Sequence, residues 1–87
     1  MSQAAMDHVM ASGRLSAATL PVMLVLAYRC GARSGLFLVR ISTHQIADDA
    51  RLSKRQTQRV LDACIEAGLL QIHAPATNRE PALYRII

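Results

Sequence analysis

Two helix-start signatures lie eleven residues apart near the middle of the chain. Ser42 is followed three positions later by Gln45, and Ser53 is followed in the same way by Gln56. In such a capping box, the serine hydroxyl and the glutamine side chain each accept a hydrogen bond from a backbone N–H that a helix start leaves unpaired. Between the two signatures, residues 49–52 leave room only for a turn. Two capped helices this close together indicate a helix-turn-helix.

The second of these helices is predicted to begin after Ser53 and to have two different faces. Side chains that recur every three or four residues form its inner face: Thr57, Val60, Leu61, Cys64 and Ile65. The outer face opens with three cations and two amides: Lys54, Arg55, Gln56, Gln58 and Arg59. Cations at a helix N-terminus oppose the helix macrodipole, and this conflict disappears if the neighbour is a polyanion.

This outer face suits the major groove of DNA, where arginine can fork to guanine and glutamine to adenine. On an isolated helix, the same residues would more often be only a solvated face. The capped pair of helices and the strand pattern that follows it favour DNA contact.

Composition narrows the class of protein. Eighty-seven residues with 52% hydrophobic content make one small domain, and a net charge of +4 favours an anionic partner. Two tyrosines and one phenylalanine are too few for the base-stacking platforms that bind single strands or RNA.

Cys30 and Cys64 belong to no metal-ligand spacing, so buried free thiols, no metal site and no cofactor are predicted. No signal peptide is visible, and the longest apolar stretch, residues 20–28, is too short for a bilayer, which predicts a cytoplasmic protein without membrane contact.

The chain before the helix-turn-helix is predicted to divide at residue 15. Residues 1–15 form an arm or short helix, either partly disordered or packed on a second subunit, with one apolar side: Ala4, Ala5, Val9 and Met10. A buried helix then starts near residues 18–20, because Pro21 fits a first helical turn. An earlier start capped by Ser16, with Pro21 distorting the helix, is the alternative. Gly31 is predicted as its left-handed stop, and residues 36–41 as a strand.

The second capped helix, the predicted recognition helix, should end at Gly68. A strand, a polar loop and a returning strand are predicted to follow it. Residues 71–74 and 82–87 are the strands, and the loop between Pro75 and Pro81 contains Asn78 and Arg79. This arrangement makes a wing, from which Arg79 can reach a minor groove or a phosphate. Pairing of Arg79 with its neighbour Glu80, or simple solvation, is equally compatible with the sequence.

Residues 16–87 resemble the winged helix-turn-helix superfamily, particularly its small bacterial, phage and plasmid domains in transcriptional regulators and replication initiators. The resemblance is carried by Ile46-Ala47, by the Leu52-Ser53 turn, and by a recognition helix that runs into residues 66–70. It implies a mainly helical α+β fold with three core helices and a wing of two to three strands. It also implies binding of double-stranded DNA, with bases read by Arg55, Gln56, Gln58 and Arg59, and phosphates held by Thr43, Ser53 and Lys54. The chain has no attached ligand-sensing domain, and no small-molecule ligand is predicted.

The leading hypothesis is a transcriptional repressor that occludes a promoter, acting as a homodimer on an inverted repeat because one winged helix reads few base pairs. The N-terminal arm and the first helix are the predicted dimer surfaces. A DNA-binding module in plasmid or phage replication or partition is the alternative, and a protein-interaction module is a third hypothesis. No enzyme is predicted: the histidines are scattered, no nucleophile has a base near it in sequence, and no phosphate-binding glycine loop occurs.

Overall fold

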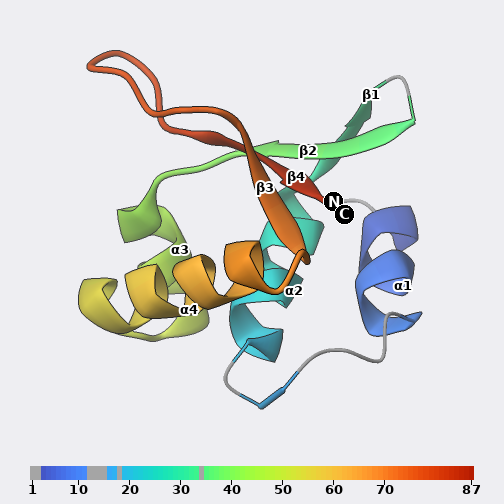
Figure 1. The fold of residues 1–87 in the computed structure, drawn as a ribbon, viewed down its shortest axis with the longest axis horizontal. Helices are drawn as coiled ribbons and strands as arrows, with labels where there is room; N and C mark the ends of the chain where they lie inside the picture. Colours follow the sequence, from blue (N-terminus) through green and yellow to red (C-terminus); the bar gives the residue numbers. More distant parts are fainter. Residues whose placement is uncertain (1–2, 12–15, 18, 34) are drawn as a thin grey trace.

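The protein has a mostly helical α+β fold in which the helices lie on one side of an antiparallel sheet (Figure 1). The computed structural model describes residues 3–11, 16–17, 19–33 and 35–87, and the side chains of all of these except 32 and 33. In these ranges the elements follow one another as α1 (Gln3–Ala11), α2 (Leu20–Arg29), β1 (Gly31–Arg33), β2 (Leu36–Arg40), α3 (Thr43–Ala50), α4 (Lys54–Glu66), β3 (Leu70–Ala74) and β4 (Leu83–Ile86). The coarse fold class predicted from the sequence is confirmed.

The capping signatures set the starts of α3 and α4. At α4 the box is complete, since the Ser53 hydroxyl accepts from the Gln56 N–H at 3.1 Å and the Gln56 side chain accepts from the Ser53 N–H at 3.0 Å. At α3 only the serine half of the predicted box forms: the Ser42 hydroxyl accepts from the Gln45 N–H at 3.1 Å, but the exposed Gln45 side chain does not return a bond to the Ser42 N–H. The predicted start of each helix is confirmed.

Both helices end in the same hydrogen-bond pattern, built on a left-handed residue. At the end of α4, Gly68 has φ 77°, and the Leu69 N–H bonds the Cys64 carbonyl at 3.0 Å, as predicted for a glycine stop. At the end of α3, the left-handed residue is Arg51, with φ 57°, and the Leu52 N–H bonds a carbonyl of α3 at 3.0 Å. A non-glycine residue in this conformation costs about 1–2 kcal/mol. The turn between α3 and α4 is therefore strained at Arg51.

The sheet has the strand order β1-β2-β4-β3 among the described residues, which is one strand more than predicted. The extra strand is β1, and it replaces the predicted left-handed stop at Gly31. That prediction is wrong: Cys30 ends α2 in an extended conformation (φ −72°, ψ 142°), and Gly31 pairs with Leu38 of β2. A chain that leaves the helix already extended can pair at once with the next strand, so no reversal at Gly31 is needed.

α2 lies at the centre of the core, where it contacts α1, α3, α4 and β2. The side chains buried there come from every helix and from the inner face of the sheet: Ala5, Val9, Val22, Met23, Leu26, Ile41, Ile46, Leu61, Cys64, Tyr84 and Ile86. No helix in the described ranges is both long and apolar enough to cross a membrane.

The N-terminal segment is a helix of the same core. α1 buries Ala5 and Val9 against α2, whereas Ala4 and Met10, which were predicted on the same apolar side, are exposed. Its His8 lies 2.7 Å from the Ile87 carbonyl oxygen. The predicted breaker at residues 12–13 lies outside the described residues. α1 therefore packs within its own chain and covers part of α2.

Candidate nucleic-acid interface

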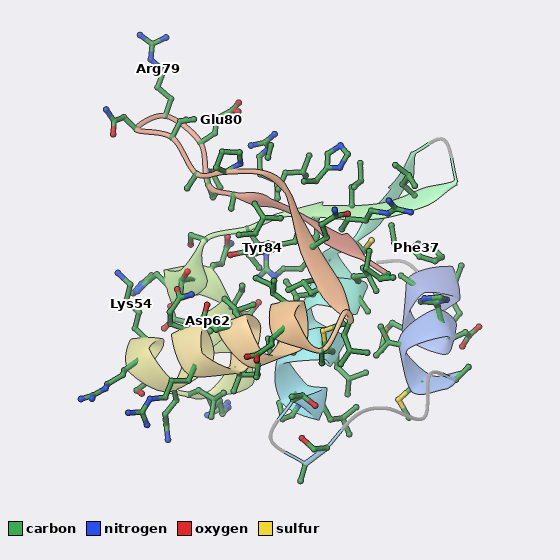
Figure 2. All side chains as sticks on the ribbon, viewed as in Figure 1. Phe37, Lys54, Asp62, Arg79, Glu80 and Tyr84 are labelled. Carbon is green, nitrogen blue, oxygen red and sulfur yellow. The ribbon has the colours of Figure 1, made fainter. Side chains whose placement is uncertain are left out.

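The predicted division of α4 into two faces is confirmed. Thr57, Leu61 and Cys64 are fully buried, and Val60 and Ile65 are partly buried against the core. On the opposite side, the five polar residues of the first two turns are all exposed: Lys54, Arg55, Gln56, Gln58 and Arg59. Figure 2 shows Lys54 at the start of this helix, pointing away from the body of the protein.

The two amides on this face already have partners within α4. The Gln56 Oε1 atom is used by the capping box, and the Gln58 Nε2 atom donates to the Asp62 carboxylate at 2.9 Å. Reading adenine with both ends of an amide would require each side chain to turn from its present orientation or to share an atom that is already hydrogen-bonded. The guanidinium groups of Arg55 and Arg59 are the donors that can be used without such a rearrangement.

The acidic side chains lie apart from the first two turns of α4: Asp62 and Glu66 are on its second half, and three others pair with residues outside it. Asp49 pairs with Arg29 at 2.6 Å, Glu80 with Arg40 at 3.2 Å, and Asp48 lies 3.5 Å from His44. Asp7 and Asp62 accept hydrogen bonds from glutamines. Within the described part of the chain, no ion pair forms at the exposed cations of the helix-turn-helix and of the wing: Arg51, Lys54, Arg55, Arg59 and Arg79. Among the described side chains, the exposed cations without an ion pair thus lie in the turn before α4, on its first two turns and at the tip of the β3–β4 hairpin.

The three residues predicted to hold phosphates differ in accessibility. Lys54 and Ser53 are exposed, and the Ser53 hydroxyl can still donate its own proton while it caps α4. Thr43 is half-buried and interacts with Tyr84. Burial raises the pKa of the Tyr84 phenol, a hydrogen bond with Thr43 partly counters this, and the negative charge of Asp62 adds to the rise. The Thr43 side chain is therefore engaged by a buried residue, Tyr84, and is not fully available to a phosphate.

The segment predicted as a wing, which keeps that name below, is a β3–β4 hairpin that projects from the sheet beyond the helices (Figure 1). Its tip is closed by Thr77, whose N–H donates to the Glu80 carbonyl at 2.8 Å, and whose Oγ1 accepts from the N–H groups of Arg79 and Glu80 at 3.3 and 3.1 Å. Asn78 and Arg79 are exposed on this ordered turn, and Arg79 points away from the body of the protein (Figure 2). The alternative in which Arg79 pairs with Glu80 is not the one adopted, since Glu80 pairs with Arg40.

Arg40 is a residue of this surface that the sequence did not indicate. It ends β2, donates from Nη1 to the Pro81 carbonyl at 2.9 Å, and makes the ion pair with Glu80. It therefore holds the base of the wing from a neighbouring strand. Its partners lie about forty positions further along the chain, so no local sequence signal could reveal it.

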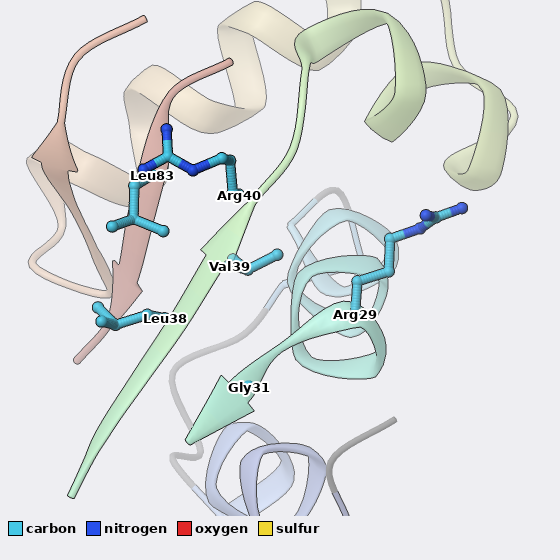
Figure 3. A pocket seen from close by; sticks show the side chains of 6 residues that line it. All are labelled: Arg29, Gly31, Leu38, Val39, Arg40 and Leu83. Atoms are coloured by element: carbon cyan, nitrogen blue, oxygen red, sulfur yellow. The ribbon is translucent and has the colours of Figure 1, made fainter. Parts of the chain in front are cut away.

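Two cavities lie near these residues. A groove of about 330 Å³ separates the start of α3 from the base of the wing and is lined, among others, by Thr43, Gln58 and Tyr84. A second cavity, of about 280 Å³, lies beside β2 between Arg29 and Arg40. Figure 3 shows that these two side chains extend in different directions, one toward α3 and the other toward β4. Their charges do not converge on the cavity, so it offers no built site for an anion.

Both cysteines belong to the core. Cys30 and Cys64 are free and buried, as predicted, and burial raises the pKa of both thiols. In the described ranges, no three His, Cys, Asp or Glu side chains come together in a group that could hold a metal ion.

Comparison with models of protein families, with curated proteins and with solved structures found no match to this chain.

Proposed function

We propose that this protein is a winged helix that binds double-stranded DNA sequence-specifically. In this proposal α4 enters the major groove, and the β3–β4 wing lies against the neighbouring backbone or minor groove. Two short helices joined at Arg51, followed by a projecting hairpin, are the elements that such a binding mode requires.

The observation that carries the proposal is the distribution of unneutralised charge. Asp48, Asp49 and Glu80 pair with residues outside α4, and Asp62 and Glu66 lie on its second half. Exposed cations without ion pairs among the described residues lie at the start of α4 and at the tip of the wing. Positive charge at a helix N-terminus is unfavourable in the free protein. Contact with phosphates removes this cost and releases counterions from the DNA, which makes binding favourable and dependent on salt.

Each part of this surface has a separate role in the proposal. Arg55 and Arg59 lie one turn apart on the exposed face of α4 and would fork to guanines. Lys54 and Ser53, at the start of the helix, would fix its register on phosphates. Arg79 and Asn78 would contact the backbone or minor groove from a wing that Thr77 and Arg40 already hold in place.

A domain that binds DNA acts on transcription most simply by occlusion, which requires nothing beyond the binding itself. We propose that the protein represses transcription by covering a promoter, as a homodimer on an inverted repeat. The same contacts would serve an origin of replication, and the genomic position of the binding site distinguishes the two roles.

Selection of random duplex DNA by the purified protein, at near-physiological salt, tests the proposal. We expect enrichment of an inverted repeat with half-sites about one helical turn apart. The double variant Arg55→Ala/Arg59→Ala should fold and enrich nothing. If the wild-type protein enriches no sequence, and its residual binding disappears as the salt concentration rises, sequence-specific binding is wrong and a protein-interaction role replaces it.

A further inference from the structure

α2 carries more apolar surface than its own chain covers. Its residues are apolar almost all round, a pattern that belongs to helices buried on every side. The fold buries Val22, Met23, Leu26 and Ala27, but the stripe on the opposite side remains open. There Leu24 and Val25 are only half-buried, and Tyr28 is 54% exposed.

This stripe forms the floor of a groove of about 430 Å³. Residues of three helices line it: Met6 of α1, Leu24, Val25, Tyr28 and Arg29 of α2, and Asp49 of α3. Neither α4 nor the wing contributes a lining residue, so the groove can be covered while the proposed DNA surface remains free.

The rim of the groove carries one positive and one negative side chain. Arg29 and Asp49 pair at 2.6 Å, and their side chains keep 38% and 35% of their surface exposed. In a two-fold symmetric contact, both copies use the same surface. If a residue of the first copy faces a different residue of the second, the same contact therefore occurs a second time with the two copies exchanged. A rim with one cation and one anion side by side therefore suits a second copy of the same chain, because each arginine can face the aspartate of the other copy.

We propose that this groove is the surface through which two copies of the chain associate. Tyr28 and Leu24 of each copy would cover the apolar floor of the other, and the two Arg29–Asp49 pairs would combine into a four-membered network at the rim. Only the consequence for DNA rests on the proposed function: the dimer would present two copies of α4 to an inverted repeat. Self-association itself can be measured without DNA, so either proposal can fail without the other.

Sedimentation of the full chain over a wide range of concentrations tests the surface. We expect a monomer–dimer equilibrium that Tyr28→Ser weakens by at least about tenfold. Ile72→Ser is the matched control, because Ile72 is 48% exposed on β3 and does not line the groove. A wild-type chain that stays monomeric up to about 1 mM overturns the proposal, and so does a dimer that Ile72→Ser dissociates and Tyr28→Ser does not.

A charge exchange tests the proposed pairing at the rim. In Arg29→Asp both rim positions are acidic, and in Asp49→Arg both are basic, so neither variant should self-associate. An equimolar mixture should form a heterodimer, because each acidic rim then faces a basic one. Circular dichroism shows whether each variant is folded, and the Tyr28→Ser comparison remains decisive if one is not. Two folded variants that fail to associate when mixed would contradict the pairing.

Discussion

The exposed faces of α2 and α4 differ in chemical character. Both helices bury one side in the same core, but α4 shows solvent a row of cations without ion pairs among the described residues, whereas α2 shows an apolar stripe whose flanking charges are paired. Leu24 and Val25 of the α2 stripe also pack partly against the core, whereas Lys54, Arg55 and Arg59 of α4 are exposed. On this difference rests our proposal of two separate surfaces for partners, one for a polyanion and one for an apolar surface like its own.

The largest expected effect is a difference in the free energy of unfolding between substitutions on the inner and on the outer face of α4. Leu61 is fully buried, so Leu61→Ala should lower the free energy of unfolding by about 2–5 kcal/mol. Arg59→Ala, on the exposed side of the same helix, should change it by less than about 0.5 kcal/mol. Urea denaturation of both variants measures the difference. Equal losses of stability would mean that the outer face is part of the structural core.

A second prediction tests what the outer face of α4 does. Arg59→Ala should cost about 1–3 kcal/mol on the selected DNA site and relax the sequence preference there. Arg85→Ala removes the same charge from a half-buried position in β4, and it should cost much less. Fluorescence anisotropy with the selected duplex and with single-base variants distinguishes them. If Arg59→Ala weakens all sequences equally, Arg59 contacts phosphate and does not read a base.

The contribution of Arg40 to DNA binding should depend on Arg79, at the tip of the wing. Because Arg40 holds the base of the wing through Pro81 and Glu80, Arg40→Ala should weaken DNA binding mainly by misplacing Arg79. In a double-mutant cycle, the two substitutions should therefore be non-additive, with a coupling of about 1 kcal/mol in binding free energy. Additive losses would show that Arg40 acts independently of Arg79.

The smallest expected effect concerns the turn between α3 and α4. Glycine adopts the left-handed conformation of Arg51 without strain, so Arg51→Gly should raise the free energy of unfolding by about 0.5–1 kcal/mol. Gly68→Ala, at the matching position after α4, should lower it by at least a similar amount. Thermal unfolding of the two variants compares them. A destabilised Arg51→Gly would mean that the arginine side chain stabilises the turn by more than the strain costs.

The parts of the fold that the sequence predicted correctly are those encoded locally. The caps at Ser42 and Ser53, the glycine stop at Gly68 and the buried face of α4 each depend on residues within one or two turns of one another. The features that it missed depend on distant partners or on atypical residues. β1 forms because β2 is beside it, Arg40 acts on a carbonyl far along the chain, and Arg51 occupies a conformation that its residue type does not signal.

The candidate surface divides in the same way. The exposed position of each α4 residue followed from helical spacing, but the engagement of Gln56 and Gln58 within α4, and of Thr43 with Tyr84, follows from side-chain packing that spacing does not determine.

The most direct measurement of sequence-specific DNA binding is the ratio of affinities for the selected duplex and for a scrambled duplex, followed as the salt concentration rises. We predict that both affinities fall with a steep log–log slope, and that the selected duplex stays about a thousandfold or more tighter throughout. A ratio that stays near one at every salt concentration would contradict sequence-specific binding by α4 and leave only the attraction of a basic surface for a polyanion.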